Sequence, residues 1–178
     1  MDVETTGTSP DRAAVIQIAA VRFNTETRAI DHNFFNRCLA IPTTRFWQED
    51  TRSWWMKQKR SVLQGIFDRM EDPRLVMSDF QDWVGFNSGL HFLSKPLSFD
   101  FPFVASYATE FGPGYGMPFS HQKGRDLRSM MSAMAPDFDE GSVAFEGDQH
   151  DALFDCLHQI KLLFAAMDHA QGHQKSRL

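Results

Sequence analysis

Residues 14–23 constrain the fold most, because they form an almost unbroken apolar run that only Gln17 and Arg22 interrupt. Such a run is typical of a strand buried on both faces, in the middle of a sheet that helices cover. Residues 28–39 form a second predicted strand. The link over 24–27 is short enough for a hairpin, so we expect the two strands to be antiparallel.

Beyond residue 50, apolar residues recur at helical spacing. This pattern predicts helices over 51–70, 74–86, 101–111, 126–134 and 151–168, with one short strand over 95–99. Strands followed by helices that alternate with short strands predict an α/β sandwich on a mixed sheet.

The chain has 178 residues with 42% apolar content, which suffices for one domain, and we assign it to residues 1–170. The polar tail over 171–178 is predicted to be disordered. The sequence has neither a membrane-length apolar run nor the pattern of a secretion signal, so we expect a cytoplasmic location. Cys38 and Cys156 fall in predicted strand and helix segments, and we predict no disulfide and no zinc site.

The net charge of −5 argues at first against a polyanionic partner, because nonspecific binding of nucleic acid depends on neutralising phosphates. An enzyme that holds cations between carboxylates nevertheless needs an acidic site. Basic residues are also locally clustered, at Lys57, Lys59 and Arg60 and again at Lys123, Arg125 and Arg128. Each cluster is equally compatible with an ordinary solvated helix face.

Asp2 and Glu4 stand two positions apart near the start of the chain, within Asp-Val-Glu-Thr-Thr-Gly. On a strand, residues two apart point to the same side, so these carboxylates project together. Two neighbouring carboxylates repel each other and favour either a shared proton or a bound cation. Oxygen ligands favour Mg²⁺ or Mn²⁺. Taken alone, the pair fits an ordinary exposed strand end equally well.

Two further aspartates are candidates for the same site. Asp100, in Ser-Phe-Asp-Phe-Pro-Phe, stands where a predicted strand gives way to a helix, and ligand sites of α/β sheets lie at strand ends. A helix N-cap is the alternative role for this residue. Asp155 lies at the edge of the apolar stripe of the last predicted helix, five residues after His150.

Together, in this order, these motifs resemble the DEDDh 3′-to-5′ exonucleases of the ribonuclease H-like fold. The segments Asp2–Thr8, Trp54–Gln58, Ser98–Asp100 and His150–Gln159 look most like the exonuclease VIII-like exoribonucleases of phages and bacteria. The likeness covers nearly the whole chain. It implies a mixed five-stranded sheet flanked by helices, and release of nucleoside 5′-monophosphates from the 3′ end of RNA or single-stranded DNA.

The resemblance also implies roles for single residues. Asp2, Glu4 and Asp155 would hold one Mg²⁺ or Mn²⁺, and Asp2 with Asp100 would hold a second. His150 would be the general base, in agreement with its ordinary pKa near neutrality. Two cations stabilise the attacking and leaving oxygens of an in-line displacement.

Four more residues are candidates for substrate binding. The backbone of Thr5 and Thr6 would meet the terminal nucleotide, as the resemblance implies. Trp54 is equally compatible with stacking on a base and with packing, whereas Trp55 continues an apolar stripe and is predicted to be core. Arg128 follows Asp126-Leu127 and is a candidate phosphate ligand, with a surface ion pair at Asp126 as the alternative reading of this segment.

One feature departs from the family pattern: only Met1 precedes Asp2, where relatives have an apolar strand. If the strand needs upstream residues, extending the chain before Met1 should raise the affinity for metal. The alternative is that contacts of Val3 with residues 14–23 hold the strand.

Two other functions stay open at this point: a cleavage-defective module that binds nucleic acid or a protein, and an enzyme acting on dinucleotides or nucleotide signals. The choice between RNA and DNA and the presence of a homodimer are open as well.

Overall fold

The computed structural model describes residues 1–85, 89–114 and 116–175. Its strands are β1 (Asp2–Thr5), β2 (Val15–Ala20), β3 (Phe35–Leu39), β4 (Met70–Glu71), β5 (Phe92–Ser94) and β6 (Gly124–Asp126). Its helices are α1 (Glu49–Trp55), α2 (Arg60–Phe67), α3 (Pro73–Val84), α4 (Leu97–Glu110), α5 (Leu127–Met134) and α6 (Ala152–Lys175), with short 3₁₀ turns η1 (His121–Lys123) and η2 (Glu140–Ser142). The predicted α/β class is confirmed.

The main sheet has the order β1-β2-β3-β4. Strand β2 pairs antiparallel with β1 and with β3, and the β2–β3 pair confirms the predicted hairpin. Strand β4 pairs parallel with β3. Strands β5 and β6 form a separate parallel pair. The predicted mixed sheet is therefore present, but its strands are divided into groups of four and two instead of forming one five-stranded sheet.

The division of the sheet has a cause at β1. The ammonium of Met1 donates to the carbonyl of Leu93 in β5 at 2.9 Å, so the two sheets meet at the start of β1. Two residues further on, the Val3 N–H donates to the Asp100 carboxylate at 3.1 Å. The Asp100 side chain thus accepts the Val3 N–H, which a continuous β1–β5 ladder would pair with a carbonyl of β5.

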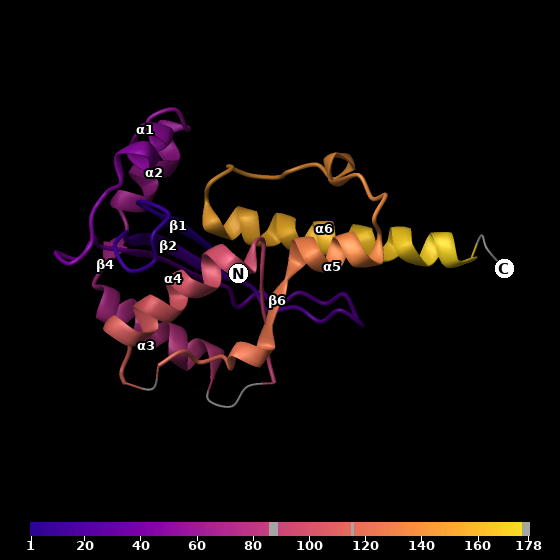
Figure 1. Cartoon of the computed structure of the whole chain (residues 1–178), viewed down its shortest axis with the longest axis horizontal. Coiled ribbons are helices and arrows are strands. Elements are labelled where there is room, and N and C mark those ends of the chain that lie inside the picture. The colour runs from indigo at the N-terminus through magenta and orange to yellow at the C-terminus, as the bar shows by residue number, and fades with distance from the viewer. Residues whose placement is uncertain (86–88, 115, 176–178) are drawn as a thin grey trace.

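Helices cover both faces of the sheet, with α6 on one side of β1 and β2 and with α3 and α4 on the other (Figure 1). Val3 packs in the core on the side of α3 and α4, together with Phe80 and Phe103. Because side chains alternate along a strand, Asp2 and Glu4 point to the opposite face, which α6 covers. The strand thereby directs both carboxylates toward the helix that carries Asp155.

Several element boundaries differ from the sequence prediction. Residues 95–99, predicted as a strand, form a turn and the start of α4, and the strand of this region is β5. The helix predicted over 51–70 is two helices, because the chain becomes extended at Lys59 and so brings both Trp55 and Ile66 into one core cluster. Helix α4 begins at Leu97 instead of residue 101, and α6 continues to Lys175. Residues 171–175, predicted to be disordered, are therefore helical, and 176–178 lie outside the described residues.

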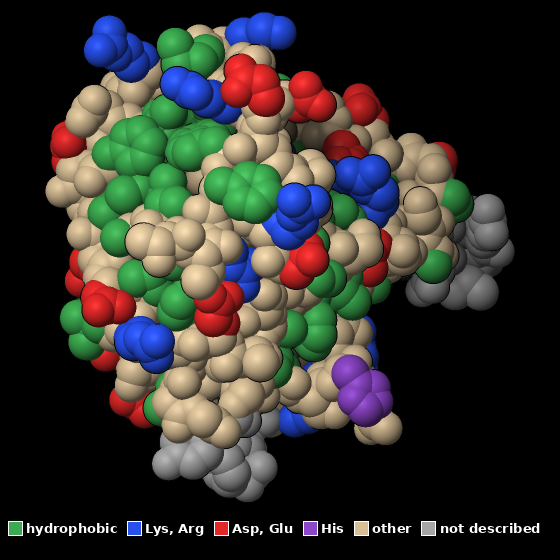
Figure 2. Space-filling view, turned by 60° about the vertical axis from the view of Figure 1, so that its left-hand side comes forward, with side chains coloured by type: hydrophobic (Ala, Val, Ile, Leu, Met, Phe, Trp, Pro, Cys, Tyr) green, Lys and Arg blue, Asp and Glu red, His purple; other side chains and the backbone are tan. Residues whose placement is uncertain are grey.

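The surface carries mixed charges, with apolar side chains gathered on the face toward which α1 and α2 lie (Figure 2). Exposed large apolar residues include Phe46, Trp54, Met56 and Phe67. Within the described part of the chain, no helix combines the length and apolar character that crossing a membrane requires. Cys38 and Cys156 are buried free thiols.

Candidate active site

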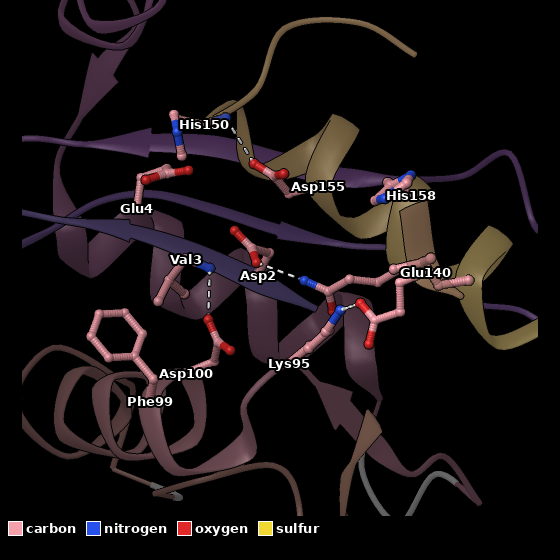
Figure 3. Close-up of a pocket in the computed structure, with 12 residues that line it drawn as sticks. Asp2, Val3, Glu4, Lys95, Phe99, Asp100, Glu140, His150, Asp155 and His158 are labelled. Atoms are coloured by element: carbon pink, nitrogen blue, oxygen red, sulfur yellow. Dashed lines mark hydrogen bonds and ion pairs between the residues drawn. The ribbon is translucent and has the colours of Figure 1, made fainter. Parts of the chain in front are cut away.

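A cavity of about 370 Å³ gathers the four predicted carboxylates, Asp2, Glu4, Asp100 and Asp155, together with His150 (Figure 3). These residues come from β1, from the first turn of α4, from the first turn of α6 and from the loop before α6. Residues far apart in the sequence therefore meet at one place.

Strand β1 supplies the floor of the cavity. Asp2 pairs in register with Ala19 and Glu4 with Gln17 of β2, so both carboxylates stand on a strand fixed by its neighbour. Glu4 is buried, and Asp2 accepts a hydrogen bond of 2.8 Å from the Gln159 side-chain amide of α6.

Asp100 approaches β1 from the opposite side of the strand. Its carboxylate is only 2% exposed and accepts the Val3 N–H, so Asp100 does not act as the N-cap of α4. The helix begins early because the Leu97 N–H donates to the Asp126 carboxylate at 2.7 Å. The sequence prediction started this helix at residue 101, whereas Pro102 lies inside α4.

His150 and Asp155 are joined by the turn that leads into α6. The His150 backbone N–H donates to Asp155 Oδ2 at 2.9 Å, and His150 adopts a left-handed conformation with φ of 65°. Such a conformation is uncommon for residues other than glycine and marks a position held by its surroundings. Ligand atoms of Glu4, His150 and Asp155 lie within 4.8 Å of one another.

The concentration of buried carboxylates changes their acidity. Burial, followed by repulsion from neighbouring carboxylates, raises the pKa of Asp2 and of Glu4 well above the ordinary range. Burial also raises the pKa of Asp100 and of Asp155 to about 6. Burial lowers the pKa of His150, so the imidazole is neutral at pH 7 and able to accept a proton.

These residues fit a divalent cation. Oxygen ligands suit Mg²⁺ or Mn²⁺, and a cation among the carboxylates removes the repulsion that otherwise raises their pKa values. The buried Gln159 Oε1 atom, moreover, has no hydrogen-bond partner among the described residues. The carboxylates and the Gln159 oxygen are therefore suited to binding a positive charge in this cavity.

A second cavity of about 400 Å³ adjoins the first, since Val3, Glu4 and Phe99 line both. Thr5, Trp54 and Trp55 are among its other lining residues. Trp55 is 2% exposed and its indole N–H donates to the Thr5 carbonyl at 3.0 Å, whereas Trp54 is 39% exposed. The Trp54 ring lies 4.6 Å from the His150 ring, centroid to centroid, at nearly a right angle.

The structure does not bring Thr6 or Arg128 into the described lining of either cavity. Thr6 is fully buried; its hydroxyl donates to the Phe46 carbonyl, and its backbone N–H donates to the Ala14 carbonyl. Arg128 is exposed on α5. The neighbouring Asp126 caps α5 by accepting the Ser129 N–H.

Five polar or aromatic residues of the cavity wall were not predicted from the sequence: Lys95, Phe99, Glu140, His158 and Gln159. His158 and Gln159 stand three and four positions after Asp155 on α6, and helical spacing places such residues side by side. That signal was available. Lys95 and Glu140 belong to segments that meet only in the folded chain, and Phe99 is an apolar residue that also packs against the core cluster.

The mixed sheet and the carboxylate cavity agree with the class that the sequence resembles, the exonucleases of the ribonuclease H-like fold. The family described as "3'-5' exoribonuclease Rv2179c-like domain" matches residues 1–167. The chain belongs to this family. A comparison with curated protein sequences gives no significant match.

Solved nuclease structures share the fold. Cell-death related nuclease 4 (CRN-4) superposes with a TM-score of 0.60 at 18% identity, covering 94% of this chain and 62% of that one. Product-bound exonuclease I gives a TM-score of 0.64 at 14% identity, over 98% of this chain and 43% of that one. An ExoI/SSB-Ct complex gives 0.61 at 16% identity, over 99% and 41%. The chain thus spans less than two thirds of the length of each of these neighbours.

Proposed function

We propose that this protein is a metal-dependent 3′-to-5′ exonuclease that hydrolyses RNA or single-stranded DNA and releases nucleoside 5′-monophosphates. The observation that carries the proposal is the convergence of Asp2, Glu4, Asp100 and Asp155 on one cavity beside His150. Membership of an exoribonuclease family favours RNA over DNA.

Two Mg²⁺ or Mn²⁺ ions are the cofactors we propose, held by the four carboxylates. When bound, the ions stabilise charge on the attacking and leaving oxygens of the phosphodiester. The protein's own part is to fix the carboxylates on β1, α4 and α6, and to hold Asp2 through the Gln159 amide.

His150 serves as the general base in this proposal. Its ring stands beside the carboxylates of Glu4 and Asp155, and the left-handed turn and the Trp54 ring hold it there. A neutral imidazole takes the proton of the attacking water as the oxygen approaches phosphorus.

The second cavity is the proposed place of the terminal nucleoside. Trp54 offers a partly exposed ring for stacking, and Thr5 lines the same wall beside Glu4. Base–aromatic stacking tolerates any base, which suits an enzyme that removes successive nucleotides. The roles of Thr6 and Arg128 in substrate binding, the homodimer and the cytoplasmic location remain predictions from the sequence.

The test is digestion of a 5′-labelled oligonucleotide, as RNA and as DNA, with Mg²⁺ or Mn²⁺. The wild type should give a 3′-shortened ladder, and Asp2→Asn and His150→Asn should give none. Asparagine suits position 150 because it tolerates the left-handed conformation. Asp82→Asn and His121→Asn alter exposed residues outside the cavity and should leave the ladder intact. Binding without turnover, unchanged by EDTA, would instead indicate a cleavage-defective binding module.

A further inference from the structure

Lys95 stands in the wall of the carboxylate cavity, between β5 and α4 (Figure 3). Among the lining residues that the structure describes, it is the one lysine or arginine. Its side chain is 15% exposed, so most of its length is packed and its ammonium is confined near the cavity. The adjoining backbone is held by the hydrogen bond between Leu97 and Asp126.

The Lys95 ammonium forms an ion pair with Glu140 of η2. The Glu140 side chain is 43% exposed and belongs to the connection over 136–149 that leads into His150. Because one partner is well exposed to water, the pair contributes little stability and exchanges at low cost. A carboxylate oxygen and a phosphate oxygen are alternative acceptors for the same ammonium.

Among the side chains that the structure describes in the cavity wall, no other carries a fixed positive charge. His158 lies beside Lys95, and burial followed by repulsion from Lys95 lowers the pKa of its imidazole, so the ring is neutral at pH 7. The remaining ionisable side chains of the described wall are carboxylates and His150. The Met1 ammonium lies near Asp2 and Asp100, but it donates to the Leu93 carbonyl and is not part of the described wall. A polyanionic strand that approaches the proposed metal site therefore meets one basic side chain in the described wall, and that side chain is paired with Glu140.

We propose that Lys95 binds a phosphate of the substrate strand and that Glu140 is a built-in competitor, which the phosphate displaces. The inference rests on the proposed function and adds to it the residue that receives the strand and the contact that restrains this residue. Glu140 acts as a positioning residue, through Lys95.

The variants Lys95→Gln and Glu140→Gln test this exchange. Steady-state kinetics on a labelled oligonucleotide should show KM raised about tenfold in Lys95→Gln, with a smaller change in kcat, since a charge-assisted contact is lost. Glu140→Gln should lower KM several-fold. The slope of log KM against log salt should fall by about 0.7 in Lys95→Gln, the contribution of one phosphate contact on a single strand.

Glu146→Gln is the matched control. Glu146 belongs to the same connection and pairs with Lys161 of α6 at 2.6 Å, but neither residue is in the described cavity wall. This variant should leave KM and the salt slope unchanged. If it lowered KM as much as Glu140→Gln, loosening of the connection would explain the effect and the proposal would fail.

Lys95→Arg guards against a folding defect, because it keeps the charge and should restore KM and the salt slope toward wild type. If the wild type cleaves the oligonucleotide and Lys95→Gln has the same KM and salt slope, the role of Lys95 is overturned but the proposed function is not. If the wild type itself does not cleave, the proposed function fails. The same ranking of variants in Kd for the oligonucleotide then decides whether Lys95 binds the strand.

Discussion

Some residues of this site lower the stability of the metal-free protein because they are suited to binding a cation. Asp100 shows this most clearly, because its carboxylate is 2% exposed yet has the Val3 N–H as its backbone partner. Burial without full compensation disfavours the charged form. A cation restores the balance, which explains how a costly group serves a metal site.

We predict that Asp100→Asn stabilises the metal-free protein while abolishing cleavage. Burial raises the pKa of Asp100 from 3.8 to about 6. The protonated carboxyl therefore contributes its full stability to the fold below pH 3.8, and this contribution is lost as the pH rises through 6. The variant removes the buried charge and keeps an acceptor for Val3. Its free energy of unfolding should exceed that of wild type by about 1 to 3 kcal/mol near pH 8.

Chemical denaturation in EDTA measures this difference. Near pH 4, where wild-type Asp100 is largely protonated, the two proteins should be about equally stable. The exposed Asp82→Asn is the control and should differ little from wild type at either pH. If Asp100→Asn were less stable than wild type near pH 8, the buried charge of Asp100 would not destabilise the metal-free protein, and the prediction would be wrong.

At the scale of elements, the connection before α6 delivers His150 and depends on one glycine. Gly147 has φ of 99°, and a Cβ there would lie 2.3 Å from the Phe154 ring of α6. L-residues rarely adopt this conformation, and the Phe154 ring would have to move to make room for the added Cβ.

Gly147→Ala should therefore destabilise the protein by about 1 to 3 kcal/mol and lower kcat by shifting His150. Gly65→Ala is the matched control, because Gly65 lies within α2 with no atom within 4 Å of the added Cβ. That change should stabilise the protein by about 0.5 to 1 kcal/mol without altering kcat. Thermal unfolding and turnover measured on both variants check the pair; full activity in Gly147→Ala would contradict the role of this connection.

Strand β1 is the second critical element, and a groove of about 470 Å³ continues its line. Met1 lies in the groove wall, with residues 20–26 following β2 on one side and residues 89–93 leading through β5 on the other. The register that pairs Asp2 with Ala19 would place further β1 residues opposite Val21 and Phe23. The groove has the shape that an extension of β1 would fill.

Lengthening the chain by about four apolar residues before Met1 should raise the unfolding temperature and the affinity for Mn²⁺, because the strand that carries Asp2 and Glu4 gains backbone partners on both sides. An extension of glycine and serine of equal length is the control and should do neither. Equal metal affinity in the two extended chains would indicate that β1 is already adequately held.

For the whole molecule, the sequence predicted what local periodicity encodes. Asp2 and Glu4 share a face because strands alternate, and the apolar run over 14–23 is the central β2. The order of motifs predicted the fold class. Periodicity did not predict the break near Lys59 or the early start of α4, because tertiary contacts of Trp55 and Asp126 decide them.

The same limit applies to the site. The four carboxylates were recognisable from their types and order, whereas the Lys95–Glu140 pair joins residues 45 positions apart in two connections without regular pattern. Likewise, Met1 and Val3 use their backbone donors on Leu93 and Asp100, and this divides the sheet that family resemblance predicted to be continuous. Long-range pairing of this kind leaves no signal in a single sequence.

Titration of the protein with Mn²⁺, followed by calorimetry or electron paramagnetic resonance, tests the central claim most directly, since it needs no substrate. The account predicts two ions per wild-type chain, weakened or lost binding in Asp2→Asn, and wild-type binding in Asp82→Asn. Equal Mn²⁺ binding by wild type and Asp2→Asn, or none by wild type, would contradict it.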